Sequence, residues 1–178
     1  MAQRLVTTEN LGAWLVKCNA DFSDVAEWAV TGHRVERWCV RPGYRTELMA
    51  LGQRVVFWVG GSRSRLVHGV WGVGYLAGAA RSEPIPVGAA GPVPTGPDRL
   101  PAGGGDRRSA AAVRWYVPLE LGVLPPDERV RREDLRADPR LADLEVFRQP
   151  QAANPSYLTT AQVAALADHV SWPVSGVA

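Results

Sequence analysis

The residues best suited to chemistry gather in one eight-residue stretch, Trp38-Cys39-Val40-Arg41-Pro42-Gly43-Tyr44-Arg45. This stretch holds two aromatic rings and two guanidinium groups. An aromatic face can stack on a flat ring, and a guanidinium can hold the phosphate attached to that ring. A second polar cluster, Lys17-Cys18-Asn19, ends the preceding apolar run. We predict that these two stretches meet and line one pocket.

A pocket of this kind is suited to a nucleobase. Trp38 and Tyr44 supply walls for stacking, and Asn19 carries both a donor and an acceptor for the edge of a base. Stacking is worth ~1–3 kcal/mol, whereas extracting a base from a duplex costs a few kcal/mol, so phosphate contacts must add to it. The cationic side chains that we expect at phosphates are Arg41, Arg45, Arg63 and Arg65, together with Lys17.

Each of these assignments has a plainer alternative. Trp38 can be a core residue of a strand, and Asn19 can cap a turn. Arg63 and Arg65 can belong to a solvated loop. The sequence leaves both sets of roles open.

Binding is easier to argue than catalysis. None of the three histidines has a matching Ser, Cys or Asp in a recognisable local frame, and no Cys/His cluster has metal-ligand spacing. Cys39 lies between two arginines and can be a reactive thiol, with an inert packed thiol as the alternative. We therefore predict no catalytic residue, no metal and no cofactor.

The composition fits one modest domain. The chain has 178 residues, 46% of them hydrophobic, and a net charge of +2, which permits nucleic-acid binding without demanding it. Two cysteines are too few for a disulfide framework. No apolar run is long enough to span a bilayer and no signal peptide is found, so a cytoplasmic site with no membrane partner is the default expectation.

Hydrophobic periodicity predicts an α+β fold with consecutive strands joined by short links. Glycines inside the strand over 66–76 indicate bends or a close approach of two backbones. The predicted strands cover 13–18, 35–40, 54–59, 66–76 and 113–119, and the predicted helices cover 24–30, 127–136 and 161–169, the last capped by Thr159 or Thr160.

This element order is typical of a small, mostly antiparallel β-barrel decorated by helices. Residues 81–110 are dominated by Pro, Gly and Ala and cannot bury enough surface to offset their ordering entropy. We expect one domain over 13–170, with 81–110 as a flexible inserted loop and with tails at 1–12 and 171–178.

Four segments, taken in order, resemble the EVE domain. That family belongs to the PUA-like superfamily and is similar in fold to YTH readers of methylated adenine. Gln53 replaces the usual Asp of a turn. The resemblance covers 13–80 and 113–168 and is carried by Trp14-Leu15-Val16-Lys17-Cys18-Asn19, Trp38-Cys39-Val40-Arg41-Pro42-Gly43-Tyr44-Arg45, Leu51-Gly52-Gln53-Arg54-Val55-Val56-Phe57-Trp58 and Gly69-Val70-Trp71-Gly72-Val73-Gly74.

The resemblance implies a pocket for a flipped or single-stranded modified base. Trp38 would be a cage wall, and Asn19 and the backbone of Cys39 would read the base edge. YTH readers take a further cage aromatic from a loop after the fourth strand, but 81–110 contains none here. Trp58, Trp71 or Trp115 would then substitute, and the expected pocket set also includes Val40.

The function expected from these features is that of a non-catalytic module reading a modified base, such as 5-methylcytosine in DNA, or a modified base in RNA. Its partners would be nucleic acid and restriction or RNA-modification proteins. Burial of one methyl group gives only about 0.8 kcal/mol, so strong selectivity needs shape and exclusion of water. The alternatives are an RNA-binding or RNA-processing PUA-like protein and a protein-interaction module without a nucleotide pocket.

Overall fold

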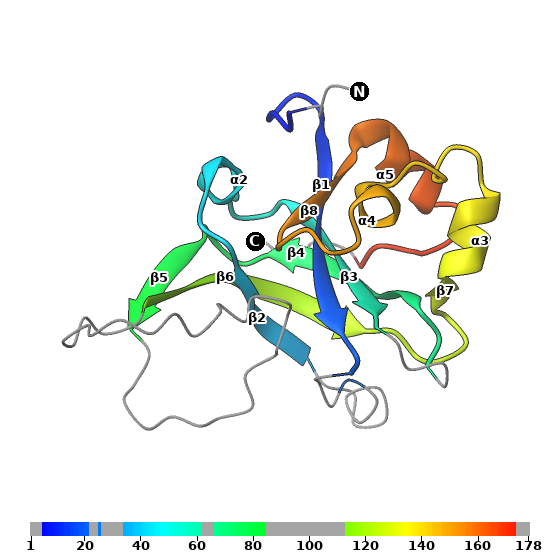
Figure 1. The fold of residues 1–178 in the computed structure, drawn as a ribbon, viewed down its shortest axis with the longest axis horizontal. Helices are drawn as coiled ribbons and strands as arrows, with labels where there is room; N and C mark the ends of the chain where they lie inside the picture. The colour runs from blue at the N-terminus through cyan, green and yellow to red at the C-terminus, as the bar shows by residue number, and fades with distance from the viewer. Residues whose placement is uncertain (1–4, 22–24, 26–33, 62–65, 85–112, 174–178) are drawn as a thin grey trace.

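The computed structural model describes residues 5–21, 25, 34–61, 66–84 and 113–173 and shows a mixed α+β fold (Figure 1). In these ranges none of the helices is long and apolar enough to cross a membrane. The strands are β1 (Leu11–Asn19), β2 (Arg34–Val40), β3 (Arg54–Gly60), β4 (Gly69–Leu76), β5 (Arg81–Pro84), β6 (Val113–Val123), β7 (Val130–Arg131) and β8 (Ser156–Thr159), and the helices are α2 (Tyr44–Glu47), α3 (Arg132–Ala137), α4 (Glu145–Arg148) and α5 (Thr160–Leu166).

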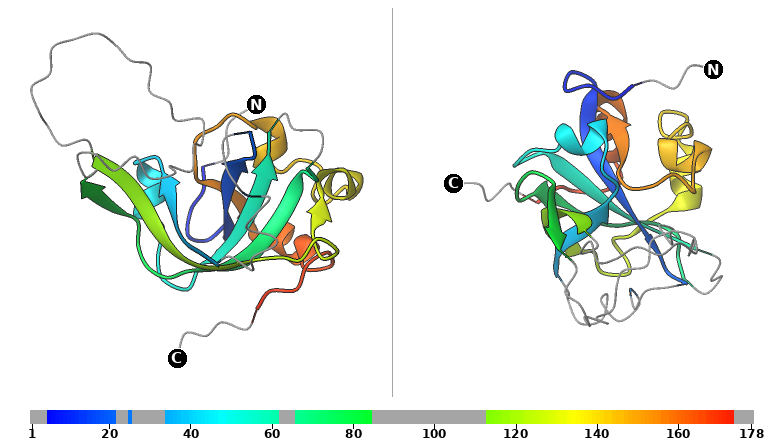
Figure 2. Two further views of the ribbon diagram at one scale, coloured as in Figure 1. Left: turned by 90° about the horizontal axis from the view of Figure 1, so that it is seen from below. Right: turned by 60° about the vertical axis from the view of Figure 1, so that its left-hand side comes forward.

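The eight strands form one curved sheet (Figure 2). Its order is β2-β6-β4-β3-β1-β8, with β5 added to β6 and β7 added to β4. Every ladder is antiparallel except the parallel pair of β1 with β3. The prediction of a mostly antiparallel α+β fold is confirmed. No ladder among the described strands joins β2 to β8, so the sheet is not closed.

Both faces of the central strand β1 are buried because the sheet separates two apolar clusters. Trp14 and Val16 point into the cluster on the concave side, which we call the inner cluster. Ala13 and Leu15 point to the opposite side, where α3, α4 and α5 cover the sheet (Figure 1). We call that second cluster the helix-side cluster. A strand buried on both faces reads as a continuous apolar run, as the sequence of β1 does.

Glycines in β4 allow this strand to approach β6 closely. A Cβ atom at Gly74 would lie 2.1 Å from the carbonyl oxygen of Glu120, and one at Gly72 would lie 2.6 Å from that of Gly122. Any side chain at these positions would push the two strands apart. The expectation of close backbone approach is confirmed.

Several element bounds differ from those expected. Residues 81–84 form β5 instead of the start of a loop, and β8 is an additional strand. The helix expected over 127–136 begins only at Arg132, because the two residues before it pair with β4 as β7. The expected helix over 24–30 lies outside the described residues apart from Val25, which is buried, as does most of the expected loop over 81–110.

Candidate functional site

The parallel pairing of β1 with β3 brings the polar end of β1 beside an aromatic residue. Lys17 lies opposite Trp58 and Asn19 lies opposite Gly60. Paired residues in a sheet share a face, and this face is the helix-covered one, since Trp58 belongs to the helix-side cluster. Lys17 and Asn19 therefore meet β3 and not the Trp38 stretch on β2, whereas Cys18 belongs to the inner cluster that also contains Trp38.

A pocket of about 400 Å³ opens at this point. Its size lies within the range of small-molecule sites. Its walls combine apolar rings with amide, imidazole and guanidinium groups. The lining residues are Lys17, Cys18, Asn19, Asp21, Trp58, Gly60, Gly61, His68, Arg132, Val146, Phe147, Pro150 and Gln151.

Two aromatic rings form the apolar wall. The ring centroids of Trp58 and Phe147 are 5.6 Å apart, with their planes at 75°. The guanidinium carbon of Arg136 lies 4.8 Å from the centroid of Phe147, which fixes that ring further by a cation–π contact. The wall is thus held in place before any ligand binds.

The loop that carries Gln151 is anchored to β1 by reciprocal hydrogen bonds. The backbone N–H of Lys17 donates to the side-chain oxygen of Asn154 (2.8 Å), and the amide of Asn154 donates back to the Lys17 carbonyl (3.0 Å). The ammonium of Lys17 donates to the carbonyl of Ala152. Lys17 is buried, so it positions this loop, and its charge lies at the pocket wall.

His68 and Arg132 line the pocket together, and the guanidinium of Arg132 supplies positive charge there. The backbone N–H of Arg132 donates to the carbonyl of His68 (2.8 Å), which holds β7 and the segment before β4 together. The Nε2 atom of His68 is covered and has no hydrogen-bond partner among the described residues. Asn19, on the far side, accepts from the N–H of Asp21 (2.9 Å), so its oxygen closes a turn as the plainer interpretation predicts.

The prediction that Trp38 is a wall of this pocket is wrong. Its side chain is 3% exposed and lies in the inner cluster, where its ring meets the edge of Phe57 with centroids 5.2 Å apart. Residues alternate along β2, so Trp38 and Val40 share the inward face. Val40 is buried with it, and Cys39, although half-buried, does not line the pocket.

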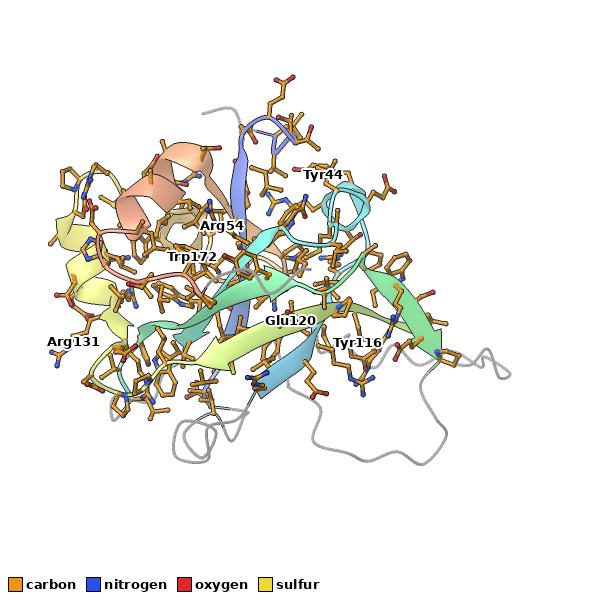
Figure 3. The ribbon with its side chains drawn as sticks, turned by 180° about the vertical axis from the view of Figure 1, so that it is seen from behind. Tyr44, Arg54, Tyr116, Glu120, Arg131 and Trp172 are labelled. Carbon is orange, nitrogen blue, oxygen red and sulfur yellow. The ribbon has the colours of Figure 1, made fainter. Side chains whose placement is uncertain are left out.

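The turn after β2 also lies away from the pocket. Tyr44 is 44% exposed on α2, and Figure 3 shows it on the opposite side of the molecule from Arg131, at the end of β7. Arg41 is exposed, and its backbone N–H donates to the carbonyl of Asn154 (2.8 Å). Neither of the two lines the pocket. Arg63 and Arg65 lie outside the described residues.

Arg45 is an internal ion-pair residue instead of a phosphate contact. Its guanidinium donates to both carboxylate oxygens of Glu145 (2.7 and 3.0 Å) and to the carbonyl of Pro155 (2.9 Å). Burial by itself lowers the pKa of Arg45, but the hydrogen bonds to Glu145 and Tyr44 outweigh it and raise that pKa. The expected phosphate role of Arg45 is therefore corrected.

The described residues contain no group of three or more His, Cys, Asp or Glu side chains that could hold a metal ion. Chemically, the pocket can hold a flat ring against the face of one of its two aromatic side chains, whose planes lie at 75°, and can offer polar groups around the edge of that ring.

Comparison with solved structures shows that this fold occurs in other proteins. A hypothetical protein from Leishmania major has a TM-score of 0.57 and 14% identity, and the match covers 91% of this chain and 96% of that one. A Pseudomonas putida protein has a TM-score of 0.55 and 17% identity, with 88% and 97% covered. A Rhodopseudomonas palustris protein has a TM-score of 0.53 and 16% identity, with 89% and 92% covered. No family model matches the chain. No curated protein matches it.

Sequence reasoning placed Lys17, Asn19 and Trp58 in the site, and the structure brings them together. It assigned no site role to His68, at the start of a predicted strand, or to Arg132, in a predicted charged helix, and it also missed Phe147 and Gln151. His68 and Arg132 are brought together by the non-local pairing of β7 with β4, since that ladder joins Gly69 to Arg131 and each of these is next to one of the two residues. Such pairings cannot be read from local sequence.

Proposed function

We propose that this chain is a non-catalytic nucleic-acid-binding module of the EVE type that takes a modified nucleobase into the pocket at the end of β1. Modified cytosine in DNA is the first candidate ligand, and a modified base in RNA is the second. The partners would be nucleic acid and the restriction or RNA-modification proteins that act beside it.

The observation that carries this proposal is the joining of Lys17, Asn19 and Trp58 in one pocket. These are the residues of the expected base site that do not depend on the Trp38 stretch. One of the two rings of Trp58 and Phe147, whose planes lie at 75°, takes the stacking role that we expected of Trp38 with Tyr44. Stacking is worth ~1–3 kcal/mol per base, so the polar rim must supply the remaining affinity.

Positive charge is available where a phosphate would lie. Arg132 lines the pocket and Arg131 is exposed beside it, so both replace Arg45 as phosphate contacts in the proposal. Guanidinium groups bind phosphate oxygens in a bidentate way, which favours a nucleotide over an uncharged ring.

The PUA-like barrel is part of the same proposal. The N–H of Arg41, just after β2, donates to the carbonyl of Asn154, just before β8 (2.8 Å). The two ends of the strand path therefore approach each other at this point. A barrel completed across this contact would brace the loop that carries Gln151 against β1.

Titration of the chain with single-stranded oligonucleotides that differ in one central base tests the proposal. The set contains cytosine, 5-methylcytosine, adenine, N6-methyladenine and an abasic position, in both DNA and RNA, at one stated salt concentration. We expect one modified base to bind more tightly than its unmodified form, by at least roughly fourfold. Equal affinity for all bases and for the abasic strand would refute base reading.

A further inference from the structure

The side chain of Trp58 is almost fully buried, but its indole N–H is open to the pocket and has no acceptor among the described residues. The side chain is 5% exposed, yet Nε1 takes part in none of the hydrogen bonds among the described residues. Two other tryptophans do have an acceptor: the N–H of Trp14 donates to Gln53 (2.7 Å) and that of Trp71 donates to the carbonyl of Val67 (2.6 Å). A buried indole N–H normally finds a partner.

The backbone next to Trp58 leaves this donor uncovered on the pocket side. A Cβ atom at Gly60 would lie 3.3 Å from Nε1 of Trp58 and 3.8 Å from its Cδ1. Gly60 lines the pocket and has no side chain, so the space in front of the N–H belongs to the pocket. The indole therefore presents both an apolar surface and a directed donor to a ligand.

We infer that the N–H of Trp58 donates a hydrogen bond to a carbonyl oxygen of the bound base, in the space over Gly60. This inference rests on the proposed function and names the class of base. Cytosine, thymine, uracil and guanine carry such an oxygen, whereas adenine carries none. The pocket accordingly selects carbonyl-bearing bases over adenine.

A base carbonyl fits this donor better than a phosphate oxygen does. Trp58 lies in the apolar wall with Phe147 and Val146, where a flat ring is in contact with carbon atoms. The guanidinium of Arg132 serves a phosphate better, because a charged donor binds an anion more strongly than a neutral one. An indole N–H can only donate, so it rejects a base that presents an amino group at this place.

The test uses single-stranded DNA with one central 5-methylcytosine, its 2-thio analogue or an abasic position. Sulfur in place of oxygen keeps the ring and its stacking surface but weakens the acceptor. We expect wild-type protein to bind the 2-thio strand about tenfold more weakly, since one net hydrogen bond is lost. Trp58→Phe keeps an aromatic wall without the N–H, and it should bind both base-containing strands equally.

One further variant and two controls keep the inference testable if Trp58→Phe folds poorly. Gly60→Ala leaves the indole intact but places a methyl group in front of its N–H, so it should lose the same preference for oxygen over sulfur. Gly122→Ala is the matched control, because a Cβ atom there meets nothing within 4 Å. Trp172→Phe removes an indole N–H that lies outside the pocket lining and should bind as wild type does.

The outcomes separate the inference from the proposed function. Binding of 5-methylcytosine over the abasic strand, with no effect of sulfur, overturns the carbonyl contact and leaves base reading in place. A preference for oxygen that survives in Trp58→Phe also overturns the contact. Equal binding of all three strands overturns both, because the protein would then contact phosphates only.

Discussion

Arg45 and Glu145 form a buried ion pair that holds α2 to α4. Their side chains are 16% and 4% exposed, and Glu145 also accepts from the N–H of Tyr157 (3.2 Å). Removing the guanidinium leaves a buried carboxylate without its charged partner. We expect Arg45→Met to lower the free energy of unfolding by about 3–5 kcal/mol, measured by urea denaturation.

Two variants check that the cost of Arg45→Met comes from the abandoned carboxylate. The double variant Arg45→Met/Glu145→Leu should recover part of the lost stability, because it buries no unpaired charge. Arg41→Met, at an exposed position, should change stability by less than about 0.5 kcal/mol. A single Arg45 variant as stable as wild type would contradict the structural role of this pair.

Trp38 is predicted to affect the stability of the fold and not the binding of nucleic acid. Trp38 packs in the inner cluster against Phe57, so Trp38→Phe should destabilise the fold by roughly 1–3 kcal/mol. Its affinity for oligonucleotides below the unfolding transition should stay that of wild type. Thermal unfolding and fluorescence titration of the same samples measure both, and weaker binding by folded Trp38→Phe would return this residue to the site.

The helix α5 begins with a reciprocal cap at Thr159. The sequence analysis left the choice between Thr159 and Thr160 open. The N–H of Gln162 donates to the hydroxyl of Thr159 (3.3 Å), and the N–H of Thr159 donates to the side chain of Gln162 (2.9 Å). We expect Thr159→Ala to cost about 1 kcal/mol in denaturant unfolding. Thr160→Ala, at an exposed helical position, is the control and should cost less than half as much.

The ends of α3 and α5 are joined by a charged network that predicts acid sensitivity. Asp138 accepts from Arg140 (2.7 Å) and faces Nε2 of His169 (3.3 Å), while Arg140 also pairs with Asp168 (2.8 Å). The hydrogen bonds from Arg140 hold the pKa of Asp138 well below its usual range. Because that pKa is lower in the folded state than in the unfolded one, the stabilisation is present above the unfolded pKa of about 3.9 and is lost as pH falls.

Asp138→Asn should therefore flatten the dependence of stability on pH between about pH 5 and pH 2. Urea midpoints measured across that interval should fall more steeply for wild type than for the variant. The variant should also be the less stable of the two at neutral pH. Asp127→Asn, at an exposed position, should keep the wild-type slope, and a parallel slope for Asp138→Asn would contradict the role of this carboxylate.

The local elements of the whole molecule follow from its sequence, but their pairing does not. Alternation and apolar runs located five strands, including β1 and β3, because side-chain burial imposes those periods. β1 pairs in parallel with β3, although β2 lies between them in the sequence, and no local sequence pattern specifies this pairing. The site was therefore only partly predicted. The end of β1 was correctly placed in it, but Trp38 was added because β2 follows β1 in sequence, whereas the strand that pairs with β1 is β3.

The charge of the whole molecule limits how it can hold nucleic acid. A net charge of +2 provides little non-specific attraction, so few phosphates are expected to be neutralised on binding. Each phosphate contact to a single strand changes the slope of log K against log salt concentration by about 0.7. We expect a slope between about −0.7 and −2 for wild type, measured with one oligonucleotide at several salt concentrations.

Arg132→Gln should reduce the magnitude of this slope by about 0.7, because Arg132 lines the pocket. Arg81→Gln is the control and should leave the slope unchanged, because Arg81 lies on β5 and pairs with Glu83 (3.0 Å). A steep slope that Arg132→Gln does not alter would mean that nucleic acid binds a different face, and the pocket at the end of β1 would then need another ligand.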